Sequence, residues 1–208
     1  KLVVPNFGFW KDLPNLIKRW LRHVDGGMNE MFVKVGTTRS GYDSASVWET
    51  QLQSLKDAQT QGKVFLGVSH SPNDDRAAAR YGFATMLLGG GGKAHFALHG
   101  DYASENWFPE YDYPIGSPVS ADTREASGVH RRRFRNGLVL VNPTDASVRV
   151  QFGGVYSGSG LSTATGATMK PHTALVLTKA GGDSPKAKRR RAAAARKRMR
   201  ARAAARRA

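Results

Sequence analysis

The chain has 208 residues, of which 40% are hydrophobic, so it is long enough for one full domain or two small ones with a buried core. It contains no cysteine, which excludes disulfides and thiolate chemistry, and it has no apolar run near the length of a membrane-spanning helix. The charge of +16 is uneven: residues 183–208 carry 12 Lys/Arg and one acid, about +11, whereas residues 1–182 carry 20 basic and 15 acidic residues, about +5.

The first half of the chain alternates between strand patterns and helix patterns. Short apolar or β-branched runs predict strands, and apolar residues at a spacing of three and four predict helices. In chain order we expect a strand at 2–7, a helix at 12–24, a strand at 26–35, a helix at 47–62, a strand at 63–70, a helix at 71–88 and a strand at 93–102.

Helix boundaries follow from residues that favour caps and stops. Asp12 is predicted to cap the first helix, with Pro14 in its first turn. Ser71 is predicted to cap the third helix, with Pro72 at its first position, and Gly62 ends the second.

The strand–helix order indicates parallel βαβ units. The strands carry apolar residues on both faces, as expected for a sheet whose outer side is covered by helices. Four strands and three helices make the second half of a (β/α)8 barrel, and they would also make a small open sheet. Periodicity alone does not separate these two folds.

The composition changes after about residue 113, where Gly, Ser, Thr and Pro become frequent. The segment 136–154 reads as two alternating strands around an Asn-Pro-Thr-Asp turn, and 172–179 reads as a last strand. We therefore predict three units: 1–125, half of a barrel with a rim loop; 126–180, a small antiparallel β domain; and 181–208, a linker and a basic low-complexity tail.

Polar residues are predicted where the parallel strands end, which is the functional edge of such folds. Two are carboxylates, Glu30 and Asp101, which we take as candidate catalytic residues. Carboxylates, amides and aromatic rings at one rim suit a sugar, because rings stack on pyranose faces and two carboxylates act at the anomeric carbon. The candidate substrate-binding residues are Asn6, Trp10, His70, His99 and Trp107.

Structural roles are the alternatives for these residues. Glu30 could be salt-bridged inside the fold, Asp101 could cap a loop, and the aromatic cluster around Trp107 could seal the barrel against the β domain. His95 and His99 have a helical metal spacing, but on a strand they lie roughly 13 Å apart and cannot share an ion. The sequence therefore indicates neither a metal site nor a cofactor.

The segments LRHVDGGMNEMF, SHSPNDDRAAARYGFATMLLGGGGKAHFAL and RRRFRNGLVLVNPT together resemble the C-terminal part of bacterial TIM-barrel glycoside hydrolases, namely the hypothetical glycosyl hydrolase family 15, over about residues 1–180. The resemblance implies a barrel strand that bears an acid at Glu30 and a β domain after the barrel. It also implies hydrolysis of O-glycosidic bonds in a poly- or oligosaccharide, with a further carboxylate from the first half of the barrel, upstream of Lys1. Half a barrel has unpaired strand edges, so we expect such a fragment to be inactive alone.

The segment 186–208 alternates Ala with Arg and Lys, which favours a lone helix or an extended chain detached from the fold. It predicts salt-sensitive binding to nucleic acid or another polyanion, and a polyanion-binding protein is one alternative function. A carbohydrate binder without catalysis is another. Because the chain begins without Met, we expect a fragment or a processed product whose N-terminus is absent. Its localisation stays open between cytosolic and secreted, and we favour a secreted bacterial protein.

Overall fold

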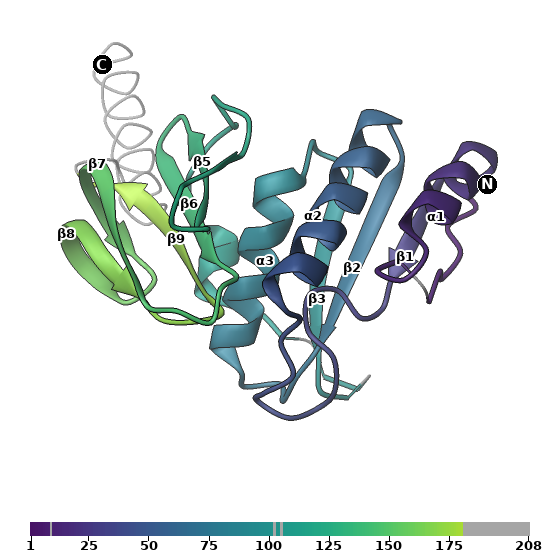
Figure 1. The fold of residues 1–208 in the computed structure, drawn as a ribbon, viewed down its shortest axis with the longest axis horizontal. Coiled ribbons are helices and arrows are strands. Elements are labelled where there is room, and N and C mark those ends of the chain that lie inside the picture. The colour runs from purple at the N-terminus through teal and green to yellow at the C-terminus, as the bar shows by residue number, and fades with distance from the viewer. Residues whose placement is uncertain (9, 102, 105, 181–208) are drawn as a thin grey trace, which may run out of the picture.

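Figure 1 presents the chain as a computed structural model that describes residues 1–8, 10–101, 103–104 and 106–180. The described residues form a three-stranded parallel sheet and a six-stranded antiparallel sheet. The helical segments are α1 Pro14–Trp20, η1 Leu21–His23, α2 Ala45–Thr60, α3 Arg76–Gly89 and η2 Pro109–Asp112. The parallel strands are β1 Gly26–Asn29, β2 Val64–His70 and β3 Ala94–His99. The antiparallel strands are β4 Thr123–Arg124, β5 His130–Phe134, β6 Gly137–Asn142, β7 Val148–Gly158, β8 Leu161–Met169 and β9 Thr173–Lys179.

The alternating order of strands and helices is confirmed, and β1, β2 and β3 pair in parallel in that order. The first predicted strand is reduced to one parallel bridge between Asn6 and Met28. Pro5 has no N–H to donate, so this segment does not build a regular ladder. The predicted strand at 26–35 ends early, because the Asn29 side chain accepts a hydrogen bond from the Met31 N–H and turns the chain away. A closed barrel is not shown.

Two predicted helix caps are wrong. The residue before α1 is Leu13, whose side chain makes no capping bond, although Pro14 does occupy the first turn. Helix α3 begins later than predicted, and its cap is Asp75, which accepts a hydrogen bond from the Ala78 N–H. Ser71 instead donates its hydroxyl proton to Asp75 at 2.5 Å. A carboxylate can accept both bonds, so it replaces the hydroxyl as the cap.

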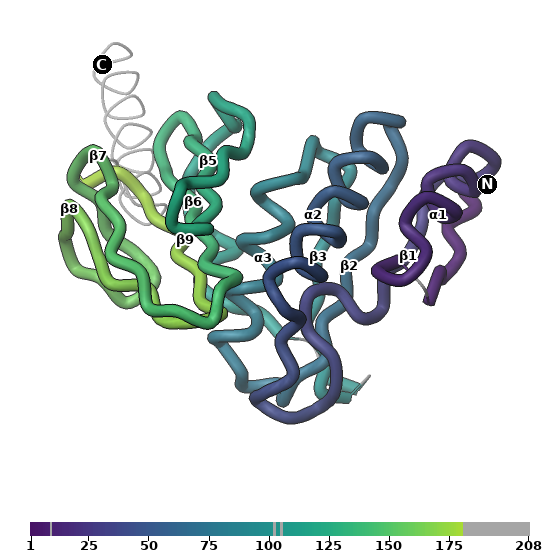
Figure 2. The backbone as a smooth tube through the Cα atoms, in the orientation of Figure 1, coloured from purple at the N-terminus to yellow at the C-terminus, as the bar shows by residue number. Residues whose placement is uncertain are grey.

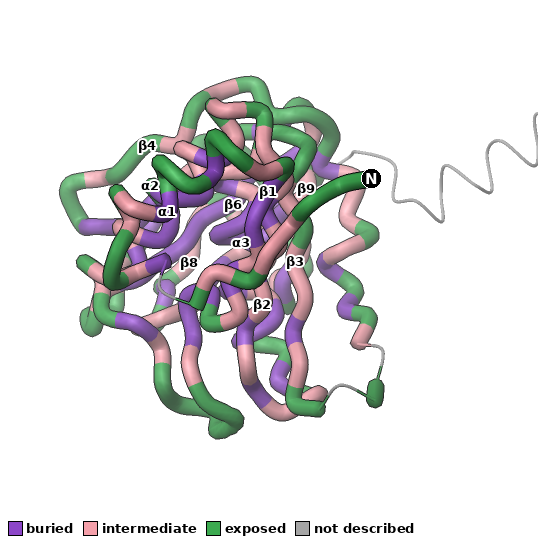
Figure 3. The backbone as a smooth tube through the Cα atoms, turned by 90° about the vertical axis from the view of Figure 1, so that its right-hand side faces the viewer, coloured by how far each residue is buried: buried purple, intermediate pink, exposed green. Residues whose placement is uncertain are grey.

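The helices form one layer on the parallel sheet. Helix α1 packs on α2, α2 packs on α3, and both α2 and α3 pack on β2 (Figure 1). Alternate residues of β2 are buried beneath them, including Phe65, Gly67 and Ser69. The opposite face of β2 is only partly buried, with Leu66 and Val68 upon it. Figure 3 marks these burial classes along the chain.

The antiparallel sheet has the order β4-β5-β6-β9-β7-β8 and confirms the alternating strands predicted after residue 126. The Asn-Pro-Thr-Asp turn between β6 and β7 is fixed by Asn142, whose amide donates to the carbonyl groups of Ala146 and Lys170. Strand β8 was not predicted, because its many small and polar residues lack an apolar alternation. Figure 2 traces the chain from the N-terminal segment to this sheet at the other side of the molecule.

Helix α3 lies between the two sheets, because it contacts β2 and β3 on one side and β5, β6 and β9 on the other. One apolar core therefore includes Trp48 and Tyr81 from the helices together with Val139 and Val176 from the antiparallel sheet. A second core lies on the far side of that sheet. Its members include Leu138, Leu140, Phe152, Tyr156 and Leu177. The two parts of the chain are thus packed together through shared apolar surface.

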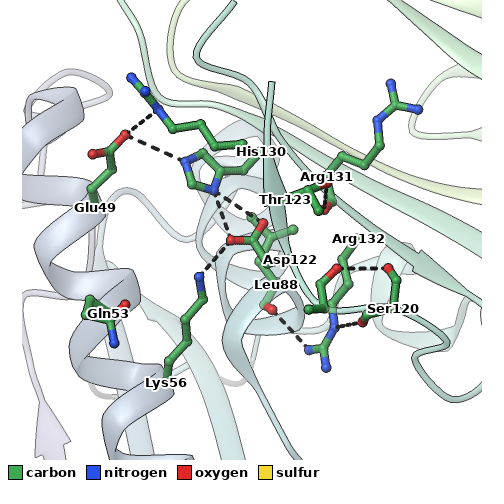
Figure 4. A network of polar contacts seen from close by, with 12 residues as sticks. Glu49, Gln53, Lys56, Leu88, Ser120, Asp122, Thr123, His130, Arg131 and Arg132 are labelled. Carbon is green, nitrogen blue, oxygen red and sulfur yellow. Dashed lines mark hydrogen bonds and ion pairs between the residues drawn. The ribbon is translucent and has the colours of Figure 1, made fainter. Parts of the chain in front are cut away.

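A polar network also joins α2 to the antiparallel sheet (Figure 4). Lys56 on α2 pairs with Asp122 at 2.7 Å, and Asp122 accepts a hydrogen bond from His130 Nδ1 at 3.0 Å. His130 also faces Glu49 at 3.7 Å. Burial raises the pKa of Asp122, but the bonds from His130 and Lys56 outweigh it and hold that pKa below its ordinary value. The carboxylate is therefore ionised and paired.

No helix in the described part of the chain is both long enough and apolar enough to cross a membrane. The predicted linker and tail, 181–208, lie outside the described residues.

Candidate active site

The parallel register brings residues from separate segments onto one face of the sheet. Leu66 pairs with His95, Val68 with Ala97, and His70 with His99. Side chains paired in this way point to the same side of a sheet, and here that side faces away from the helices. His70 and His99 are the last residues of β2 and β3, so they lie at the carboxyl edge of the sheet.

Glu30 lies at this edge, immediately after β1. The Asn6 amide donates a hydrogen bond to Glu30 Oε2 at 2.7 Å, and His70 Nε2 lies 4.0 Å from Glu30 Oε1. The Glu30 side chain keeps 34% of its surface exposed. Three residues predicted for the site, from three adjacent segments, are therefore brought together around a carboxylate that solvent or a ligand can reach.

The end of β1 is anchored to α2 by a buried polar chain behind Glu30. Asn29 donates to Gln51 Oε1 at 2.7 Å, and Gln51 donates in turn to Asp43. Lys11 pairs with Asp43 at 3.1 Å. Because Asn29 precedes Glu30 and is 4% exposed, these bonds fix the backbone from which the carboxylate projects.

Lys34 is a further buried group near this edge. Its ammonium donates to the carbonyl groups of His70 at 3.0 Å, Thr38 at 2.5 Å and Gly36 at 3.4 Å. Burial lowers the pKa of Lys34, and the negative charge of Asp75 opposes that shift. All three protons of the ammonium have acceptors, so Lys34 holds the loop after β1 against the end of β2.

Asp101 follows β3 in an exposed loop and accepts several hydrogen bonds. Its oxygens accept from Asn73 Nδ2 at 2.7 Å and from the N–H groups of Ala103 and Ser104, each at 2.9 Å. These bonds, with that of Ala103 the largest influence, lower the pKa of Asp101. Asp101 is therefore an ionised carboxylate that also organises its own loop.

The aromatic candidates differ in their exposure. Trp107 is 72% exposed, and its indole N–H donates to Asp112 at 2.9 Å. Trp107, His99 and Asn106 line an open cleft of about 720 Å³ beside β3. Trp10 is only 1% exposed and donates its indole N–H to the Met28 carbonyl. Its ring packs in the core and presents no face to a sugar.

Sequence reasoning missed several polar residues of this region. Lys34 carried a signal, because it is a lone charge between two valines of an apolar run. Asn73 and Asn106 carried none, since amides are ordinary in loops. Asn106 donates to Asn73 Oδ1 at 2.9 Å and to the Leu98 carbonyl, so the two amides tie the loop of Asp101 to the start of α3.

Among the residues that the structure describes, no three His, Cys, Asp or Glu side chains gather in a way that could hold a metal ion. The arrangement at the edge is instead one of a reachable carboxylate, amide and imidazole groups, and an exposed indole ring. Such a set can bind hydroxyl groups and exchange a proton with a ligand.

Comparison with protein families identifies a family model that matches this chain. The sequence model described as "Hypothetical glycosyl hydrolase family 15" matches residues 8–138, more than half of the chain. The matched region contains Glu30, His70, His99 and Asp101, whereas Asn6 precedes it. A search of curated proteins finds no match.

Proposed function

Since the chain belongs to hypothetical glycosyl hydrolase family 15, we propose that it is part of a glycoside hydrolase that cleaves O-glycosidic bonds of a poly- or oligosaccharide, with Glu30 as its general acid/base. One observation carries the choice of residue. Glu30 accepts a hydrogen bond from Asn6, lies near His70 at the carboxyl edge of the parallel sheet, and is still 34% exposed.

The proposed chemistry is a proton transfer to the glycosidic oxygen. Glu30 in its protonated form gives a proton to the leaving oxygen as the bond to the anomeric carbon breaks. The carboxylate left behind then accepts a proton from the water molecule whose oxygen forms the new bond to the anomeric carbon, which regenerates the protonated acid. Asn6 orients the carboxyl group, and His70 and His99 donate to sugar hydroxyls. Trp107 stacks on a pyranose face, because its ring is exposed beside the cleft along β3.

Asp101 is our candidate for a second carboxylate. Its lowered pKa keeps it ionised at neutral pH, as a nucleophile or a stabiliser of positive charge requires. A further acid from other strands of a (β/α)8 barrel is the alternative partner for Glu30. Two features support a barrel: the parallel order β1-β2-β3, and the single layer of helices on one face.

The test compares Glu30→Gln with the unchanged protein, expressed together with any coding sequence upstream of Lys1. With glycosides whose leaving group needs protonation, we expect turnover to fall about 10²- to 10⁴-fold while sugar binding persists. With dinitrophenyl glycosides, whose leaving group departs unprotonated, the loss should be smaller. Asp101→Asn should lower turnover for both substrate types.

Glu49→Gln is the matched control, because Glu49 lies on α2 and pairs with Arg124 rather than facing the edge of the sheet. Its turnover should stay within about twofold of the unchanged protein. Turnover near the unchanged level in a folded Glu30→Gln variant would contradict the assignment of Glu30.

The basic tail supports a second candidate function, binding to a polyanion. The observation is compositional: about +11 of the net charge of +16 lies in residues 183–208. A carbohydrate binder without catalysis is the third candidate. It predicts that the unchanged protein binds sugar but shows no turnover, so that Glu30→Gln and Asp101→Asn have no turnover to lower.

A further inference from the structure

Strand β5 carries two arginines on the face of its sheet that bears the second core. Arg131 pairs with Leu140 of β6, and Arg133 pairs with Leu138. Directly paired residues of antiparallel strands share a face, and Leu138 and Leu140 belong to the second core. Arg131 and Arg133 therefore stand on the side of the second core, at its margin. Figure 4 shows Arg131 directed away from His130 and Arg132.

These arginines border a groove of about 580 Å³. Its volume lies within the range of about 300–1,000 Å³ that is usual for sites of small ligands. Arg135 and Lys179 also line it, and Phe152 and Tyr156 form its apolar floor. Among the residues that the structure describes, no acidic side chain lines the groove. The groove is therefore cationic along its walls and apolar at its base.

The groove holds cations that the described residues do not neutralise. Arg131 pairs with Glu125 at 2.6 Å and donates to the Gln151 carbonyl. Among the described residues, Arg133 and Arg135 make no ion pair, and Lys179 donates only to the Arg135 carbonyl, at 3.2 Å. Residues two apart on one face of a strand lie roughly 7 Å from each other, so these like charges repel. A bound anion would relieve that repulsion.

We propose that this groove binds the carboxylate or sulfate groups of an acidic polysaccharide, as an accessory site separate from Glu30. The inference rests on the proposed function for its ligand class, a glycan. Guanidinium groups bind such anions through paired N–H donors, and low-dielectric walls strengthen the attraction. The groove lies on the side of the antiparallel sheet that faces away from α3, whereas the edge that carries Glu30 belongs to the parallel sheet beyond that helix.

Stacking of nucleic-acid bases fits this groove less well. Base stacking needs exposed ring faces, but Phe152 and Tyr156 are 3% and 6% exposed. Their rings lie in the second core and provide a floor rather than a stacking platform. The cations Arg133, Arg135 and Lys179 are exposed in the groove, and they suit a chain that carries its charge on each sugar unit.

The experiment measures binding of oligogalacturonate to the full chain by calorimetry. The double variant Arg133→Gln/Arg135→Gln should weaken the Kd at least tenfold, and Lys179→Gln alone should weaken it several-fold. Full methyl esterification of the ligand, which removes its charge and keeps its backbone, should cause a similar loss. The control Arg22→Gln/Arg149→Gln removes the same charge from exposed sites outside the groove and should leave the Kd within twofold.

The same measurements on a chain truncated after Gly182 separate the groove from the tail. If Arg133→Gln/Arg135→Gln still weakens the binding of oligogalacturonate in the truncated chain, the proposal is supported. Binding that disappears with the tail, or that is unchanged in both groove variants, overturns it. Binding of duplex DNA alone through Arg133 and Arg135 also overturns it. Because no turnover is measured, the result is independent of whether Glu30 is catalytic.

Discussion

Arg132 joins the antiparallel sheet to the end of α3, and its replacement by Met tests how strongly the two parts of the chain are connected. The guanidinium donates from Nη1 to the carbonyl groups of Leu87 at 2.8 Å, Leu88 at 3.0 Å and Gly90 at 2.8 Å. Its Nε donates to the Ser120 carbonyl at 3.1 Å. The end of a helix leaves its last carbonyl groups without intrahelical partners, and Leu87 and Leu88 lie in the last turn of α3 with Gly90 directly after it. Arg132 therefore acts as a C-terminal cap supplied by another element.

The expected loss of stability follows from three N–H donors, because the two protons of Nη1 are shared among three carbonyl groups and the Nε proton serves the fourth. A hydrogen bond from a charged donor contributes about 1.5–3 kcal/mol, but water can replace part of it at a site that is only partly buried. Burial also lowers the pKa of Arg132, because the charged guanidinium loses part of its hydration in the folded protein. An uncharged Met side chain has no such desolvation cost, which offsets part of the lost hydrogen bonding. Methionine keeps the apolar stem. At about 1 kcal/mol for each N–H donor, Arg132→Met should lower the free energy of unfolding by about 3 kcal/mol.

Equilibrium unfolding in urea at pH 7, followed by tryptophan fluorescence, measures this loss. Because the apolar core is shared between the helices and the antiparallel sheet, we expect a single transition. Arg149→Met is the control, since Arg149 is exposed on β7, and its effect should stay within about 0.5 kcal/mol. A loss below about 1 kcal/mol for Arg132→Met would refute the reasoning that this side chain caps α3.

Two further predictions concern alkaline stability and the tail. Burial and the negative charge of Asp75 raise the pKa of Tyr42 to about 12, so its contribution to stability should be complete below the ordinary tyrosine pKa of about 10 and should be lost as the pH rises toward 12. Unfolding measured between these pH values should show that Tyr42→Phe removes part of the loss, and an unchanged pH profile would contradict this. The full chain should bind duplex DNA with an affinity that falls steeply with salt, and removal of the residues after Gly182 should abolish this binding. Titrations of both chains at low and moderate salt measure it, and equal binding by both chains would exclude the tail as the binding element.

Local chemistry determined much of the architecture. The apolar spacing of Trp48, Leu52 and Leu55 predicted one face of a helix, and all three are buried in the shared core. Short apolar or β-branched runs predicted β2, β3 and β9, and the order of strands and helices predicted parallel pairing. These features depend on residues close in sequence, so a single sequence is enough to predict them.

The tertiary structure decided which of the candidate residues lie at the edge of the sheet and which lie in the core. The sequence placed Trp10 and Trp107 alike beside the rim, but packing against Phe65 buries Trp10, whereas Trp107 stays exposed. The meeting of Asn6, Glu30 and His70 depends on strand register, which local pattern does not specify. Arg132 caps α3 through contacts between residues more than 40 positions apart in the sequence. The cationic groove depends on contacts between residues about 20 positions apart. Long-range packing, which a local pattern cannot encode, sets each of these arrangements.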